Sequence, residues 1–348
     1  MSKNRKKKKE QEEVSVEETE LSEENSSTDD KKNAEKKKKK RRSILAFTCV
    51  IALGAVSGTA IGLWLRGRAL SQRRDFNEDE YKDDFSAILK KYEDVQDKES
   101  TNFTEILSPV EMIQVAFHLL SETNYISEGV GVLTNSYSGD QLITSIKGKM
   151  DDVYYFETIS KGKMVNLGRR YFQQGENITY YNYDTLEKSE TSDIVHATYK
   201  DKQLEMTKED YKATFGSYLS DTTDYLFSSK TVFTGTTPTA NATADGYDIQ
   251  IRFSEDATET YKTRIIAMDS KVSNVPSFAY VDIHCTMDKQ LRLKTFDITE
   301  EYTVLALGVV TAKCNGTLNS KYYYAEDGLT NSWLPTSIEA YYFQEEKQ

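Results

Sequence analysis

The sequence has few of the residues from which catalytic and cross-linked sites are built. Its 348 residues include only 3 cysteines, 3 histidines and 4 prolines. No HExxH, GxSxG, SxxK or phosphate-binding glycine loop occurs. The histidines, His118, His196 and His284, show no paired spacing typical of metal ligands. We therefore expect no enzyme activity, no cofactor and no metal site.

Cysteine is also too scarce for a disulfide framework. If the segments 278–287, 290–299 and 301–313 form a meander, Cys285 and Cys314 lie about 25 Å apart by strand spacing and rise. A disulfide requires Cα atoms within about 7 Å of each other. We expect both thiols to be free and buried.

Charge is absent from one long stretch, residues 44–65. As a helix it would measure about 33 Å, enough to cross a hydrocarbon core of about 30 Å. The stretch has no polar face, so we predict a transmembrane helix. A cleaved signal peptide is the alternative, but such peptides have apolar cores of about 7–15 residues and short basic leaders. Here the leader, residues 1–43, is long.

The charges on either side of this stretch predict its orientation. Seven consecutive cations precede it: Lys36, Lys37, Lys38, Lys39, Lys40, Arg41 and Arg42. Because Lys and Arg mark the cytoplasmic side, we expect a single-pass protein of the cell membrane. Its tail, 1–43, would be cytoplasmic and disordered, because it has too few apolar residues to form a core. Residues 66–348 would be extracellular.

The exported part carries 30 Lys and Arg against 45 Asp and Glu. Such an acidic balance argues against nucleic acid or another phosphate-rich partner. It suits a cationic partner or a neutral exterior.

Three glycines stand four residues apart within the predicted membrane helix, at Gly54, Gly58 and Gly62. In lipid, small residues at this spacing let a second helix approach closely. The stripe therefore predicts helix packing, with a homodimer or an unknown helical partner. The alternative is composition alone, because glycine is commoner in membrane helices than in soluble ones.

The exported region is expected to be α+β. Apolar spacing predicts helices over 77–98 and 108–123, the second with Ser108 as N-cap, Pro109 at the first position and Glu111 at the third. We assign 66–127 to a helical stalk and packing helices, and 128–348 to a β-rich domain. A short helix is expected near Thr207. Alternation with period two predicts antiparallel strands in 151–160, 163–172, 176–184, 246–254, 260–269, 277–288, 290–299 and 318–325.

The order of two helices followed by a long meander containing "LGRRYFQQGENITYYNYDT" resembles the LolA/LppX class of extracytoplasmic half-barrel proteins. This resemblance implies a curved antiparallel sheet around helices, with a cavity for lipid acyl chains. It rests on element order and one strand pattern, and a shared fold does not establish a shared function.

Tyrosine is abundant, with 23 residues. Strands favour tyrosine, but consecutive tyrosines point to both faces of a sheet, and exposed ones supply rigid contact area. The candidate binding surface consists of Tyr180, Tyr181, Tyr183, Tyr322, Tyr323 and Tyr324. We predict a membrane-anchored, non-enzymatic binding or assembly protein of the cell envelope, with a protein partner. The alternative is a carrier or sensor of a lipid or other apolar ligand.

Overall fold

The structure is a computed structural model of the chain, which divides into two units, residues 1–62 and 63–348. The residues that it describes are 58–98, 101–163, 165–200, 204–269 and 271–327. The predicted tail and the first part of the predicted membrane helix, 44–57, lie outside these residues. The rest of that stretch begins helix α2 (Gly58–Ser71). Within the described ranges, no helix combines the length and the apolar character needed to cross a membrane.

A large antiparallel sheet dominates the second unit, as the sequence predicts, and it has twelve strands in the described residues. Its order is β6-β5-β4-β3-β2-β1-β12-β11-β10-β9-β8, with β7 also paired to β5, and it is not closed. The strands are β1 (Tyr125–Asn135), β2 (Gly139–Met150), β3 (Val153–Gly162), β4 (Asn166–Gln174), β5 (Asn177–Lys188), β6 (Val195–Tyr199), β7 (Leu204–Thr207), β8 (Thr239–Thr243), β9 (Gly246–Phe253), β10 (Ser277–Met287), β11 (Leu293–Ala306) and β12 (Val310–Tyr324). The first and last strands of the series, β1 and β12, pair along their length in the middle of the sheet.

The helices predicted after the apolar stretch, over 77–98, over 108–123 and near Thr207, are present, with one break. The expected helix over 77–98 forms two pieces, because the side chain of Asp84 accepts a hydrogen bond from the amide of Ala87 and starts a new helix. The capping box of Ser108 and Glu111 forms as predicted. The remaining helices are α3 (Glu78–Tyr81), α4 (Phe85–Glu93), α5 (Pro109–Glu122), α6 (Lys208–Phe215) and α7 (Glu259–Met268), with short 3-10 turns η1 (Phe103–Glu105), η2 (Ser229–Thr231), η3 (Glu255–Thr258) and η4 (Ala325–Asp327).

The predicted strand over 260–269 is wrong, because this segment is helix α7. The side chains of Lys262 and Ile266, four residues apart, are both buried on the helix. The ammonium of Lys262 lies 2.8 Å from the carboxylate of Glu255 and 2.7 Å from that of Glu259. Burial of a charge is tolerated when it is paired.

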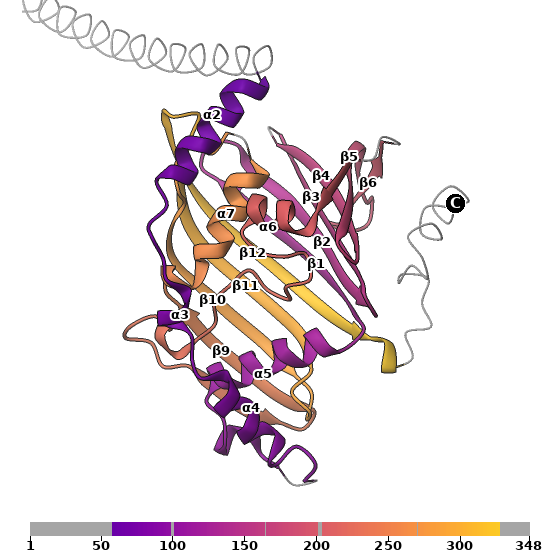
Figure 1. Cartoon of the computed structure of the whole chain (residues 1–348), viewed down its shortest axis with the longest axis vertical. Helices are drawn as coiled ribbons and strands as arrows, with labels where there is room; N and C mark the ends of the chain where they lie inside the picture. The colour runs from indigo at the N-terminus through magenta and orange to yellow at the C-terminus, as the bar shows by residue number, and fades with distance from the viewer. Residues whose placement is uncertain (1–57, 99–100, 164, 201–203, 270, 328–348) are drawn as a thin grey trace, which may run out of the picture. The chain divides into compact units, whose positions relative to one another are not determined.

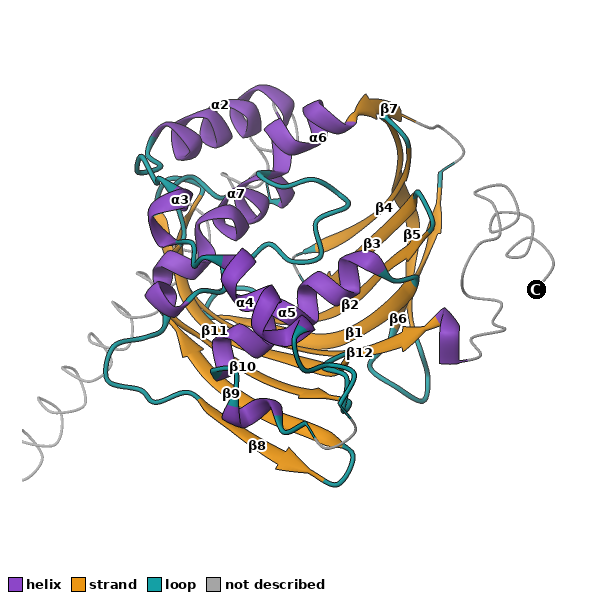
Figure 2. Ribbon diagram, turned by 60° about the horizontal axis from the view of Figure 1, so that its bottom comes forward, coloured by secondary structure: helices purple, strands orange, loops and turns teal. Residues whose placement is uncertain are grey.

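The sheet curves around the helices, which lie on its concave side (Figures 1 and 2). Helices α4 and α5 cover the inward faces of β9, β10 and β11, where large apolar side chains form the main core. We call this the packed half. The inward faces of β1, β2, β3 and β12 lie beneath α7 and the segment 222–225, and we call this the hollow half. Aromatic side chains of α6, β4 and β5 form a second, smaller core.

Candidate functional site

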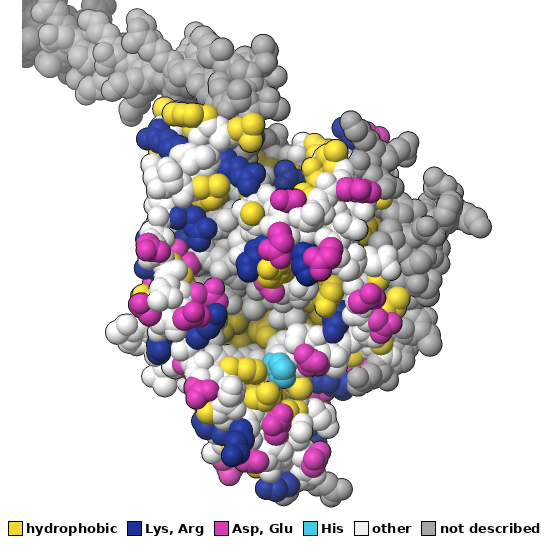
Figure 3. Space-filling view, in the orientation of Figure 1, with side chains coloured by type: hydrophobic (Ala, Val, Ile, Leu, Met, Phe, Trp, Pro, Cys, Tyr) yellow, Lys and Arg dark blue, Asp and Glu magenta, His cyan; other side chains and the backbone are white. Residues whose placement is uncertain are grey.

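A cavity of about 750 Å³ lies in the hollow half, between the sheet and α7. The floor of the cavity is the inward face of the sheet. It leaves space because small residues face inward across neighbouring strands. Gly129 pairs with Ser145 on one side and with Ser320 on the other, and Ser145 pairs with Thr158. Residues in register point to the same face, so these side chains all line the cavity floor. Space-filling representation shows this side of the molecule hollowed between the helices, with hydrophobic side chains at depth (Figure 3).

The walls of the cavity are mixed in chemistry. Apolar and polar side chains alternate around it, so it is not the continuous apolar concavity that the half-barrel resemblance implies. The apolar wall includes Phe117, Ile143, Phe156, Leu167, Met268, Phe296, Ile298 and Leu318. The polar wall includes Gln141, Lys147, Ser160, Asn166, Arg169, Asp224, Arg264 and Glu300. Such a lining suits a molecule with both an apolar and a polar part.

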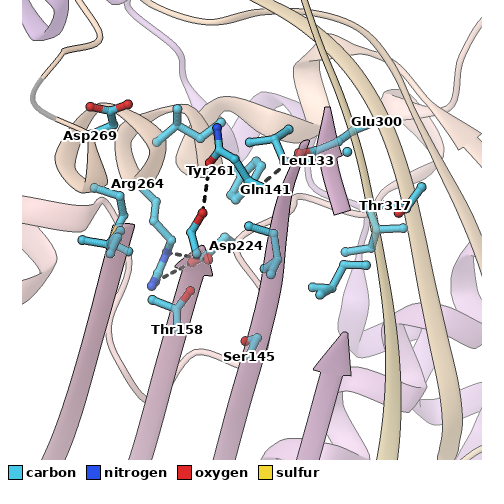
Figure 4. A pocket seen from close by; sticks show the side chains of 18 of the residues that line it. Leu133, Gln141, Ser145, Thr158, Asp224, Tyr261, Arg264, Asp269, Glu300 and Thr317 are labelled. Carbon is cyan, nitrogen blue, oxygen red and sulfur yellow. Dashed lines mark hydrogen bonds and ion pairs between the residues drawn. The ribbon is translucent and has the colours of Figure 1, made fainter. Parts of the chain in front are cut away.

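An ion pair joins the two segments that cover the cavity on the side opposite the sheet, which we call its roof (Figure 4). Nε of Arg264 on α7 lies 2.6 Å from one carboxylate oxygen of Asp224, and its Nη2 lies 2.9 Å from the other. The hydroxyl of Ser217 donates to the same carboxylate, at 2.6 Å. Burial opposes ionisation of Asp224, but the guanidinium of Arg264 and the ammonium of Lys147 hold its pKa below the usual value. This pair joins the segment 222–225 to α7.

Glu300 is the second buried carboxylate of the cavity, and its partners are neutral. It lies on β11 opposite Gly316 of β12, and its exposed fraction is 7%. The hydroxyl of Tyr225 donates to Oε2 at 2.9 Å, and that of Tyr261 donates to Oε1 at 3.4 Å. Within the described residues, Glu300 forms no ion pair. Burial raises the pKa of Glu300 to about 7, against the opposing effect of the two hydroxyl groups.

Besides Arg264, the cations Lys147, Arg169 and Lys271 line the cavity. The ammonium of Lys147 donates to the backbone carbonyl of Asp221, and burial lowers the pKa of Lys147 to about 8. On β4, Nη1 of Arg169 lies 3.8 Å from the sulfur of Met268. These groups, together with Glu300, were not identified from the sequence. Glu300 lies four and two residues after the apolar residues Phe296 and Ile298 on the same strand, so all three face the same side of the sheet. This spacing is the sequence signal that could have placed Glu300 on the inward face.

The six predicted tyrosines do not form one surface. Tyr323 is the exposed member, Tyr180, Tyr183 and Tyr322 are half-buried, and Tyr181 and Tyr324 are buried. Three of them are on β5 and three on β12, and β4, β3, β2 and β1 separate these strands in the sheet. Tyr183 and Tyr322 line the cavity instead.

The predicted glycine stripe and basic cluster fall mainly outside the described residues. Gly58 and Gly62 belong to α2, whereas Gly54 and the cations 36–42 lie outside. Helix packing and orientation therefore stay predictions from the sequence.

The histidines lie away from the cavity lining. His284 is half-exposed on the outward face of the sheet, where Nε2 lies 2.9 Å from the carboxylate of Asp248 and Nδ1 lies 3.6 Å from that of Asp297. Within the part of the chain that the structure describes, no group of three His, Cys, Asp or Glu side chains is placed to hold a metal ion.

Cys285 and Cys314 are both free and buried, as predicted. Cys285 on β10 pairs with Phe296 on β11, and Cys314 lies on the next strand, β12. Cys314 lines the cavity, and burial raises the pKa of its thiol to about 11, so it stays protonated at neutral pH.

No protein-family model matches this chain, and no curated protein is significantly similar to it. The candidate site therefore rests on its own geometry and chemistry.

Proposed function

We propose that residues 63–348 form a binding module that takes an amphipathic small molecule into the cavity of the hollow half. The cavity, at about 750 Å³, carries the proposal. Ligand sites typically measure about 300–1,000 Å³ and combine apolar walls with a few polar groups. Of the two classes predicted from the sequence, a protein-binding module calls for a filled core and an aromatic surface, whereas a carrier or sensor calls for a cavity. The geometry favours the second class, with an amphipathic rather than a purely apolar ligand.

The binding module is tethered to a membrane in this proposal. The uncharged stretch 44–65 and the cations 36–42 support an anchor with the binding module outside the cell. A site held close to a bilayer would meet amphipathic molecules at raised local concentration, which suits a carrier or a sensor of the cell envelope.

The chemistry of the lining supports binding without catalysis. The described lining contains no histidine, and the thiol of Cys314 is protonated at neutral pH. The ion pair of Asp224 and Arg264 is engaged in holding the roof. A non-enzymatic module is therefore the simplest function for this cavity.

Native mass spectrometry of the full-length chain, released from detergent micelles, tests the proposal. We expect a co-purified small molecule, at one per chain. Ser320→Trp places a large side chain on the cavity floor and should remove this bound mass. Asn319→Trp is the matched control, because Asn319 is the adjacent residue of β12 and is exposed on the other face. A bound mass that persists equally in both variants would refute a ligand in the cavity.

A further inference from the structure

We propose that the cavity recognises an organic cation, an amine or quaternary ammonium group on an apolar body, and that Glu300 supplies the counter-charge. This inference rests on the proposed function, because it specifies the polar group of the ligand. It follows from the surroundings of Glu300, which differ from those of the other buried carboxylate, Asp224.

The first step is the charge balance. Asp224 faces the guanidinium of Arg264, with two contacts of 2.6 and 2.9 Å. Glu300 receives only the hydroxyls of Tyr225 and Tyr261, at 2.9 and 3.4 Å, and has no ion-pair partner in the described chain. Hydroxyl groups stabilise a carboxylate but do not neutralise it, and an uncompensated buried charge is costly. A cation bound in the cavity would neutralise Glu300.

The second step is the aromatic surroundings. Tyr225, Tyr261 and Tyr302 all line the cavity, and they come from the segment 222–225, α7 and β11. The rings of Tyr225 and Tyr261 lie 4.9 Å apart between centroids. The faces of aromatic rings attract cations, and aromatic side chains are used to recognise quaternary ammonium groups. A carboxylate among tyrosine rings therefore favours an organic cation over a metal ion, for which a single carboxylate is a poor ligand set.

The third step concerns the remaining charges of the cavity. The guanidinium of Arg264 is paired with Asp224. The ammonium of Lys147 donates to the carbonyl of Asp221 and is attracted by the carboxylates of Asp224 and Asp221. The groups acting directly on Glu300 are Tyr225 and Tyr261, and their hydroxyls are neutral below pH 10 because burial raises the pKa of both well above that value.

Two more titratable groups are electrostatically coupled to Glu300, Tyr302 on its own strand and Cys314 on β12. Burial raises the pKa of both side chains, so both are neutral at pH 6–8. Ionised Glu300 is therefore the charge that lies beside Tyr225 and Tyr261. Asp269 and Lys271, at and just beyond the end of α7, also line the cavity. Arg169, on β4, is the group that would favour an anion instead.

The test uses the full-length chain in lipid nanodiscs, with empty nanodiscs as the blank. Isothermal titration calorimetry compares three probes of similar shape: phenyltrimethylammonium, its neutral isostere tert-butylbenzene, and the anion benzoate. We expect the cation to bind at least about tenfold more tightly than benzoate. Its affinity should fall about tenfold from pH 8 to pH 6, because Glu300 becomes protonated across its pKa of about 7.

Glu300→Gln is the decisive variant, because it keeps the shape and removes the charge. It should weaken binding of phenyltrimethylammonium at least about tenfold at pH 8, remove the pH dependence, and leave binding of tert-butylbenzene unchanged. Glu301→Gln is the control. Glu301 is the next residue, faces outward and pairs with Lys313 at 2.8 Å, so its replacement should change nothing.

The possible outcomes separate the two proposals. The cation site is overturned if phenyltrimethylammonium binds equally to Glu300→Gln and to the unaltered chain. It is also overturned if benzoate binds more tightly than phenyltrimethylammonium. In that case, binding of tert-butylbenzene that Ser320→Trp abolishes still supports a ligand cavity. Failure of the unaltered chain to bind any of the three probes counts against both.

Discussion

The packed half and the hollow half belong to one continuous antiparallel sheet, yet their inward faces differ in size and polarity. In the packed half, Ile249, Phe253 and Ile283 face inward and are almost fully buried under the helices. In the hollow half, the same face carries Gly129 and Ser145. The ladder of hydrogen bonds is continuous across both halves. Strand pairing therefore joins both halves into one curved sheet. The size of the inward side chains decides whether the space on its concave side is filled.

The helices over the two halves are held by different forces. Helix α5 buries an apolar face, so its attachment comes mainly from removal of apolar surface from water. Helix α7 also buries Ile266 in the main core, but its Arg264 is paired with Asp224 of the segment 222–225, so an ion pair contributes to its attachment. A directional pair can hold a helix above the sheet without filling the space beneath it, and the cavity lies beneath this part of α7.

The largest effect on stability is expected when the same substitution, isoleucine to alanine, is compared in the two halves. Ile113→Ala on α5 removes a side chain that is fully buried, and should lower the free energy of unfolding by about 3–4 kcal/mol. Ile143→Ala removes a half-buried wall of the existing cavity, and should cost about 1 kcal/mol because fewer contacts are lost. Urea unfolding followed by circular dichroism measures both. Equal losses would contradict the division into halves.

The packed half was the more predictable from the sequence. Its strands alternate in polarity, and the capping signals at Ser108 fix the start of α5, so local patterns are enough. Helix α7 was missed because its β-branched residues favour a strand, whereas its helical form depends on distant partners such as Asp224 for Arg264. The pairing of β1 with β12 also joins segments far apart in the chain. Neither long-range contact has a local signal.

The site was less predictable than the fold. Adjacent residues of a strand point to opposite faces, and the exposures of Glu300 and Glu301 agree with that rule. What could not be seen is that Tyr225 and Tyr261, from separate elements, converge on one of them. Tyrosine runs drew attention to Tyr180 and Tyr323, whereas the residues around the buried carboxylate are single tyrosines.

The next largest effect is the pH dependence of stability that comes from Glu300. The pKa of Glu300 is raised from 4.5 to about 7, so the folded chain binds more protons than the unfolded chain between these pH values. Stability should therefore fall as pH rises from about 4.5 to 7, by up to about 3 kcal/mol. Glu300→Gln removes this loss, so the variant should be more stable than the unaltered chain at pH 8 and nearly equal to it at pH 4.5. Urea unfolding at several pH values measures the difference, and a pH-independent difference would refute the assignment.

A smaller effect comes from adding volume rather than removing it. Ala116→Leu inserts a larger side chain beneath α5, where Ala116 is fully buried, and should cost about 1–3 kcal/mol through overpacking. Ser145→Leu adds a similar volume to the floor of the cavity, and should change stability by less than about 1 kcal/mol because the space is available. Thermal unfolding of the two variants distinguishes them. A larger loss for Ser145→Leu would mean that the cavity cannot take an apolar group.

The smallest effect should be the same in both halves, because it depends on local geometry alone. Ser108 caps α5 in the packed half, and its hydroxyl accepts from the amide of Glu111 at 3.3 Å. Thr207 caps α6, which packs on β4 and β5 beside the hollow half, and its hydroxyl accepts from the amide of Asp210 at 3.1 Å. Each substitution by alanine removes one such hydrogen bond and should cost about 1 kcal/mol in urea unfolding. A negligible cost for Thr207→Ala beside a full cost for Ser108→Ala would show that α6 opens before the rest of the domain unfolds, and the two halves would then differ in cooperativity as well as in packing.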